Sequence, residues 1–232
     1  MKPSRTTIVA VAVLVTVAFA VLIASSLIGP PAPAESTYAY SVTLGTDAAL
    51  TNLSLLLPLP AAADGTAPVA EAVRDGNATV PDGWRATVLE TDSGPVLRLE
   101  ATAVPAAARP DGRQYSTYQF GVTVPTGDAI DTGDPFGQEP TLAPVDGRRE
   151  RPCPNLAAPD PGQTCYDFDA SVTLAYEAPA DAAVTIDLVH TGANVDGSGR
   201  HRMYYERLSL ALEGPQDGSK VVTGFASTEA DG

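Results

Sequence analysis

Lysine is nearly absent from this 232-residue chain, which contains only Lys2 and Lys220 beside 12 arginines. All 28 acidic residues lie at or after Glu35, so residues 35–232 carry 12 basic against 28 acidic side chains, a net charge of −16. A surface this acidic would repel the phosphates of nucleic acid, and we therefore expect no nucleic-acid partner.

Familiar catalytic motifs are also missing. The chain has no G-x-S-x-G, no H-E-x-x-H, no phosphate-binding loop and no dinucleotide fingerprint. This argues against a familiar hydrolase or nucleotide enzyme, and we do not expect an enzyme. The two histidines, His190 and His201, flank a turn that could bring them together, but they lack a third ligand or a nucleophile. A half-buried histidine at a strand end is the favoured interpretation.

Cysteine is limited to Cys153 and Cys165. In an oxidising exterior they predict one disulfide that closes a short loop. Two free thiols are the alternative. A zinc site is disfavoured because two thiolates do not complete a tetrahedron and neither histidine is near in sequence.

Charge is absent from residues 6–34, and residues 8–28 are almost wholly apolar. A helix of this length spans roughly 31 Å, about the thickness of the hydrocarbon core of a bilayer. The sequence therefore predicts a transmembrane helix over residues 7–28 that acts as a signal-anchor. Because Lys2 and Arg5 precede it, we expect residues 1–6 in the cytoplasm and the rest outside the cell.

A cleavable signal peptide is the alternative interpretation of this segment. Ala32-Pro33-Ala34 has the small-residue pattern of a cleavage site, although Pro33 fits a peptidase groove poorly. The apolar run is also longer than that of an ordinary signal peptide, so the uncleaved anchor is favoured. Residues 29–36 are predicted to form an extended Pro- and Ala-rich stalk.

Beyond the stalk, apolar and polar residues alternate with a period of two, which is typical of half-buried strands. The pattern predicts nine strands: residues 36–45, 49–57, 84–90, 96–104, 114–124, 166–176, 182–190, 203–213 and 221–226. No segment after the anchor shows a helical stripe. We therefore predict a mostly β protein, in which residues 37–232 form one antiparallel β-sandwich, either immunoglobulin-like or jelly-roll-like.

The longest connection, residues 125–165, has little strand pattern, and loops of this length tend to be functional or disordered. It contains Asp128, Asp131 and Asp134. Carboxylate oxygens are the ligands that Ca²⁺ prefers, so this triplet is a candidate calcium site and calcium the only candidate cofactor. The EF-hand order is missing, and a solvated acidic loop is favoured instead.

Two further groups are candidates for binding. Asn194 and Asp196 lie in a Gly-rich turn and could bind a cation or a sugar, although a plain hairpin loop is favoured. Arg148, Arg149 and Arg151 form the main basic cluster. They could pair with an acidic partner or an anionic glycan, but more often such a run offsets acids of its own chain.

Asn77 and Asn52 each begin an Asn-x-Ser/Thr acceptor pattern for N-glycosylation. The predicted orientation places both on the translocated side. Asn77 is favoured because it follows Asp75-Gly76 in a loop, whereas Asn52 lies within a predicted strand.

The acidic, Lys-poor, Asp- and Ala-rich composition and the anchor-plus-domain layout resemble the membrane-anchored surface proteins of halophilic archaea. The resemblance carries no activity or site. From the anchor and the predicted sandwich we expect a single-pass membrane protein with a binding, structural or accessory role in the cell envelope and an envelope protein as partner. A pilin-like filament subunit is one alternative, and an envelope enzyme with a site in loop 125–165 is another.

Overall fold

A computed structural model describes residues 35–107, 115–142, 147–154, 163–195 and 201–229 of the chain. The predicted membrane helix and most of the predicted stalk lie outside these residues. Within the described part of the chain, no helix has the length and apolar character needed to cross a membrane.

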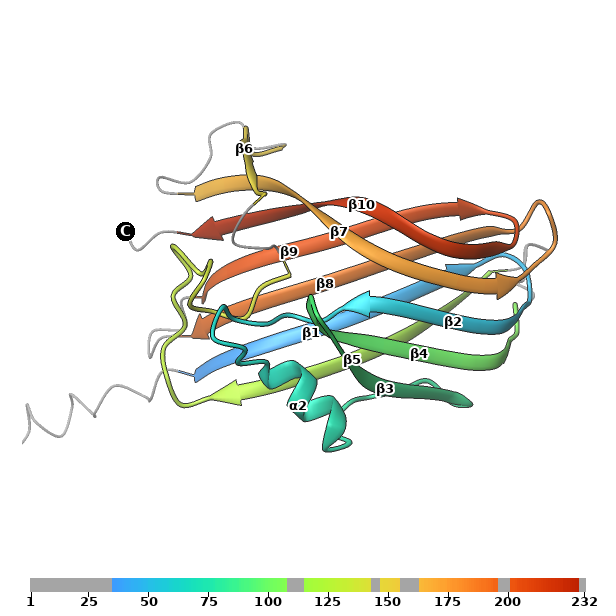
Figure 1. The fold of residues 1–232 in the computed structure, drawn as a ribbon, viewed down its shortest axis with the longest axis horizontal. Coiled ribbons are helices and arrows are strands. Elements are labelled where there is room, and N and C mark those ends of the chain that lie inside the picture. The colour runs from blue at the N-terminus through green and yellow to red at the C-terminus, as the bar shows by residue number, and fades with distance from the viewer. Residues whose placement is uncertain (1–34, 108–114, 143–146, 155–162, 196–200, 230–232) are drawn as a thin grey trace, which may run out of the picture.

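The described residues form ten strands and one helix, coloured along the chain in Figure 1. They are β1 (Glu35–Thr46), β2 (Leu50–Pro58), α2 (Pro68–Arg74), β3 (Trp84–Thr91), β4 (Gly94–Val104), β5 (Ser116–Thr126), β6 (Arg149–Arg151), β7 (Gln163–Glu177), β8 (Ala183–Val195), β9 (His201–Glu213) and β10 (Gln216–Glu229). All strand pairs that are described are antiparallel, in the order β3-β4-β2-β7-β10-β9-β8-β1-β5, with β6 beside β7.

The mostly β, antiparallel architecture is confirmed, and each of the nine predicted strands overlaps a strand of the structure. The period of two arises because alternate side chains face opposite sides of the sheet. In β1, for example, Tyr38, Tyr40, Val42 and Leu44 are buried on the inner face, while the residues between them are partly exposed. The sequence did not predict β6, which has only three residues.

Two separate sheets, as a β-sandwich requires, are not confirmed. The strands instead form one hydrogen-bonded sheet that curls around its own apolar face (Figure 1). Along the main strand order, the shortest pairing is between β9 and β10, where residues 205–207 pair with residues 225–227.

The helix α2 was not predicted, because seven residues are too few to show a helical stripe. Proline occupies the first turn, where its missing N–H costs nothing, and Val69, Ala70, Ala72 and Val73 are buried. The helix contacts β5, β3, β1 and β4, so it covers the opening between the two edges of the curled sheet (Figure 1).

The sheet has two ends. At one, β1, β7 and β9 begin, β5, β8 and β10 end, and residues 127–142 fold over the inner face; we name it the loop end. The opposite end, where β8 and β10 begin, is the distal end. The core between them is built from inward-facing Leu, Val, Tyr and Phe side chains of the strands.

Candidate functional site at the loop end

Polar side chains of the strands attach residues 127–142 to the inner face. Asn194 of β8 donates its Nδ2 to the carbonyl of Ile130 (2.7 Å) and accepts the Ile130 N–H at Oδ1 (2.9 Å). Ser36 donates to the same Oδ1 (2.8 Å). The Asn194 amide is therefore occupied by the loop backbone and is not available to the ligand that the sequence suggested. Asp196 lies outside the described residues.

A histidine and a carboxylate lie buried beneath the loop. His190 of β8 and Glu206 of β9 are directly opposed in the antiparallel register, and both side chains are fully buried. Glu206 Oε2 lies 3.0 Å from His190 Nδ1 and accepts the Leu142 N–H at 2.8 Å. His190 Nε2 is buried without a hydrogen-bond partner in the described structure. A carboxylate at Nδ1 leaves Nε2 as an acceptor, which is the arrangement of a general base.

Two tyrosines flank the histidine ring. Tyr38 stacks with it at a centroid distance of 6.4 Å, and Tyr204 meets it edge-on at 5.6 Å. Tyr38 donates its hydroxyl to Glu139 Oε2, and Tyr204 donates to the Pro140 carbonyl (2.6 Å). Burial, and then the hydrogen bond and charge of Glu139, raise the pKa of Tyr38. Burial followed by the charge of Glu206 raises that of Tyr204, so both tyrosines remain protonated donors.

A cavity of about 490 Å³ opens beside this cluster. Tyr38, Glu139 and Asp128 line it, together with Thr66 and Gln138. His190 is not among the residues that line it. The cavity carries two carboxylates and could hold a small cationic or hydroxyl-rich molecule.

The three aspartates proposed for calcium take different roles. Asp131 Oδ1 accepts the N–H groups of Gly133 (3.1 Å) and Asp134 (2.9 Å), which stabilises the turn. Its own N–H donates to Glu139 Oε1 (2.8 Å). Asp128 faces the cavity instead. Nowhere in the described ranges do three or more His, Cys, Asp or Glu gather in a way that could hold a metal ion.

The two histidines do not come together. The β8–β9 hairpin forms as expected, but His201 pairs with Val195 and is exposed, whereas His190 is fully buried. The expectation of a half-buried histidine at a strand end is wrong, because Glu206 provides a partner inside the core. Sequence reasoning missed Glu206 itself. The signal was a charged residue at an inward position of β9, two residues before the buried Leu208.

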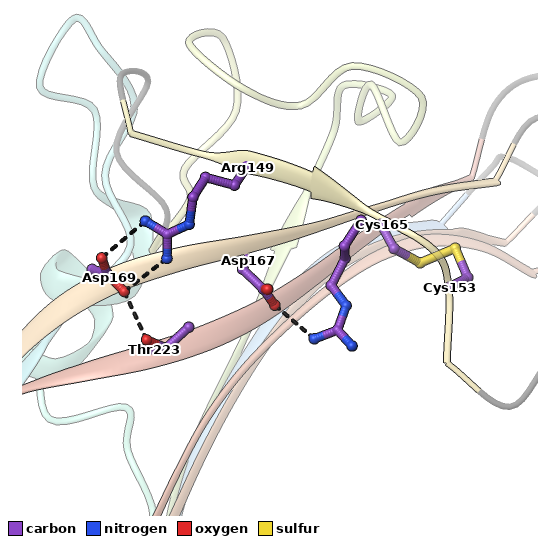
Figure 2. A network of polar contacts seen from close by, with 7 residues as sticks. Arg149, Cys153, Cys165, Asp167, Asp169 and Thr223 are labelled. Carbon is purple, nitrogen blue, oxygen red and sulfur yellow. Dashed lines mark hydrogen bonds and ion pairs between the residues drawn. A yellow bond between two sulfur atoms is a disulfide. The ribbon is translucent and has the colours of Figure 1, made fainter.

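The disulfide between Cys153 and Cys165 is present. Just before it, β6 lies along β7, where Arg149 bonds both carboxylate oxygens of Asp169 (3.1 Å each) and Arg151 bonds Asp167 (2.8 Å). Figure 2 shows that Asp169 also accepts a hydrogen bond from the hydroxyl of Thr223 in β10. These two arginines thus offset acids of their own chain.

The third arginine of the basic cluster, Arg148, stacks its guanidinium over the Phe136 ring at 3.6 Å. This contact joins residues 127–142 to residues 147–154, which are the two described parts of the long connection.

The two glycosylation candidates, Asn52 and Asn77, are both exposed. Asn52 lies in an irregular part of β2 with a positive φ of 53°, and Asn77 follows α2.

Comparison with known proteins adds no relative: no family model, no curated protein and no solved structure matches the chain.

Proposed function

We propose that the chain is a single-pass membrane protein whose β domain lies outside the cell, and that it binds an envelope partner near the membrane surface. The observation that carries this proposal is the position of Glu35. It begins β1 at the loop end, so the strand includes the last two residues of the predicted stalk, residues 35 and 36. Residues 29–34 in extended geometry span only about 19 Å, so the loop end would lie close to the bilayer.

The chemistry of the loop end supports a binding or structural role over a catalytic one. Asn194, Glu206 and Tyr204 each bond the backbone of residues 130–142, and Glu139 bonds both Tyr38 and Asp131. Side chains used in this way hold a loop in one conformation. A preformed surface loses little conformational entropy on binding, which favours recognition.

Membrane placement is tested first, on the full-length chain in cells that make it naturally. Protease added to intact cells should digest the β domain, and the domain should remain with the membrane fraction until detergent is added. A protected domain would contradict the proposed orientation. A domain released to the medium with Glu35 as its first residue would mean that the segment is a cleaved signal peptide.

The partner is tested by affinity capture from native membranes in high salt and mild detergent, followed by mass spectrometry. A partner that docks beside the membrane surface would meet the loop end first, so Asp128→Asn at the cavity should reduce its yield. Asp217→Asn at the distal end is the matched control and should not. Equal yields from both variants would contradict binding at the loop end.

An envelope enzyme remains the second candidate, because His190 and Glu206 have the arrangement of a general base beside a cavity. It requires a substrate to reach the buried His190 ring, which does not line the cavity. Turnover of glycan, ester or peptide substrates that is lost in His190→Gln, with the fold intact, would favour this candidate. A pilin-like role would instead be favoured by filaments in electron micrographs.

The composition further supports a proposal that the surface is adapted to high salt, as in the halophilic proteins it resembles. Dense carboxylates hold hydrated cations, and salt screens their mutual repulsion.

A further inference from the structure

The outer face of the sheet carries a shallow groove of about 710 Å³ over β8, β1 and β5. Its floor consists of small or uncharged side chains: Ala39, Ser41, Gln119, Gly121, Thr123, Val189 and Thr191. Among the residues that the structure describes, no Asp, Glu, Lys or Arg lines it. In a segment with a net charge of −16, an uncharged groove of this size needs an explanation.

The rim of the groove is formed by residues 77–79, which include an acceptor tripeptide for N-glycosylation. Thr79 and Gly121 exchange both backbone hydrogen bonds (2.7 and 3.0 Å), so this segment is fixed along the free edge of β5. The Asn77 N–H caps α2 by donating to the Ala72 carbonyl, and Asn77 is exposed. Its amide is thus held at the edge of the groove.

The second acceptor, Asn52, has less suitable surroundings. The residue after it, Leu53, is buried in the core, and β2 pairs with β4 on one side and β7 on the other. The surface beside Asn52 also carries the charges of Arg85 and Glu100.

We propose that Asn77 is glycosylated and that the first sugars of its glycan occupy this groove. In the attachment step, the Asn77 Nδ2 forms a bond to the anomeric carbon of a lipid-phosphate-linked oligosaccharide. The carbon–oxygen bond to phosphate breaks, and the phosphate leaves with the amide proton. The step requires the translocated side, so the inference rests on the proposed extracellular placement.

The groove suits a tethered sugar. Hydroxyl groups of Ser41, Thr123 and Thr191 and the amide of Gln119 can each donate and accept hydrogen bonds, as sugar hydroxyls do. Tyr40 is the one aromatic residue among the described residues of the groove, and its side chain is buried on the inner face, so a free sugar would bind weakly. A glycan attached at the rim has a millimolar effective concentration, at which weak contacts are sufficient.

The test uses the full-length protein purified from the membranes of its native cells. Peptide mass spectrometry should find a glycan on Asn77, and Thr79→Ala should abolish it while Thr79→Ser retains it. Occupancy of the groove is measured by the rate at which a maleimide labels the thiol introduced by Thr191→Cys. That rate should rise on the order of tenfold when Asn77→Gln is added, as expected if the glycan fills the groove about nine-tenths of the time.

Ala211→Cys is the matched control, because residue 211 is exposed on β9 away from the groove, and its labelling rate should not respond to Asn77→Gln. If Asn77 carries no glycan although protease digests the domain from outside the cell, the inference is overturned and the proposed function stays intact. A glycan on Asn77 with equal labelling rates in both backgrounds overturns occupancy of the groove. A protease-protected domain overturns both proposals together.

Discussion

Ionisable side chains are paired in two regions of this domain, beneath the loop and on the outer face of the sheet. The His190–Glu206 pair has no exposed surface and shares its carboxylate with the backbone of the loop. The outer pairs, such as Arg207–Asp187, expose a third to a half of each side chain. The inner and outer pairs should therefore contribute differently to stability, because water and salt screen the outer pairs and cannot reach the inner one.

The largest effect should come from removing the inner carboxylate. Glu206→Leu leaves the Leu142 N–H and His190 Nδ1 without their acceptor, and should lower the free energy of unfolding by roughly 3–5 kcal/mol. Denaturant unfolding checks this, with Glu213→Leu at an exposed position of the same strand as the control. Glu206→Gln keeps an oxygen acceptor and should give an intermediate loss. If the leucine variant at 213 costs as much as the one at 206, the inner pair has no special role.

Removing the disulfide ranks second. Cys153→Ser combined with Cys165→Ser reopens a loop whose cysteines are 12 residues apart, which should cost about 3 kcal/mol. Hydrogen exchange of the β6 amides should accelerate with it, since the disulfide reinforces the backbone pairing and the Arg–Asp pairs that attach this short strand to β7. An unchanged unfolding midpoint would contradict a stabilising role of the disulfide.

The sequence predicted the strands and the disulfide better than the buried contacts beneath the loop, and the reason is physical. A period of two depends only on which face of a strand is buried, so it located nine strands. The cysteine spacing predicted the disulfide in the same local way. The inner site depends on contacts between residues far apart in the chain, such as Asn194 with Ile130 and Glu206 with Leu142. No local pattern encodes those contacts.

The curl of the sheet could not be predicted either. Strand patterns do not record which strands pair, and the order of the sheet follows from pairings as distant as β1 with β8. The helix α2 escaped prediction because Val69, Ala70, Ala72 and Val73 are too short a run to distinguish a helix from an apolar loop. The acidic composition, by contrast, is evident directly from the sequence.

Lowering the salt should destabilise the domain through its outer surface. Transfer from about 3 M to about 0.1 M KCl lengthens the Debye screening distance to about 10 Å and exposes the net charge of −16 to its own repulsion. We expect the melting temperature to fall by roughly 5 °C, on the order of 2 kcal/mol for a domain of this size. The cost of Glu206→Leu should stay constant between the two salt concentrations, because that pair is not exposed to ions. A melting temperature that does not change with salt would contradict adaptation to high salt.

A single outer pair should contribute little. Asp187 Oδ1 accepts hydrogen bonds from Arg207 and from Ser209 (2.6 Å), yet the pair is too exposed for Arg207→Gln to cost more than about 1 kcal/mol. A double-mutant cycle with Asp187→Asn measures the coupling, and it should weaken as salt is added. A coupling as large as the cost of Glu206→Leu would remove the distinction between the two regions.

The smallest effect on stability should appear only at acidic pH. The hydrogen bonds from Arg149 and then Thr223 lower the pKa of Asp169 below its usual range. Because the folded pKa is the lower one, the stabilisation is complete above the unfolded value of about 3.9 and is lost as the pH falls through the folded value. Thr223→Val removes one of the two donors, so the carboxyl carbon resonance of Asp169 should titrate at a higher pH in the variant. The same substitution should leave stability near pH 7 almost unchanged, because the carboxylate stays ionised and Arg149 still pairs with it. If Asp169 titrates identically in both proteins, Arg149 alone sets its pKa, and the hydroxyl of Thr223 adds nothing to this outer network.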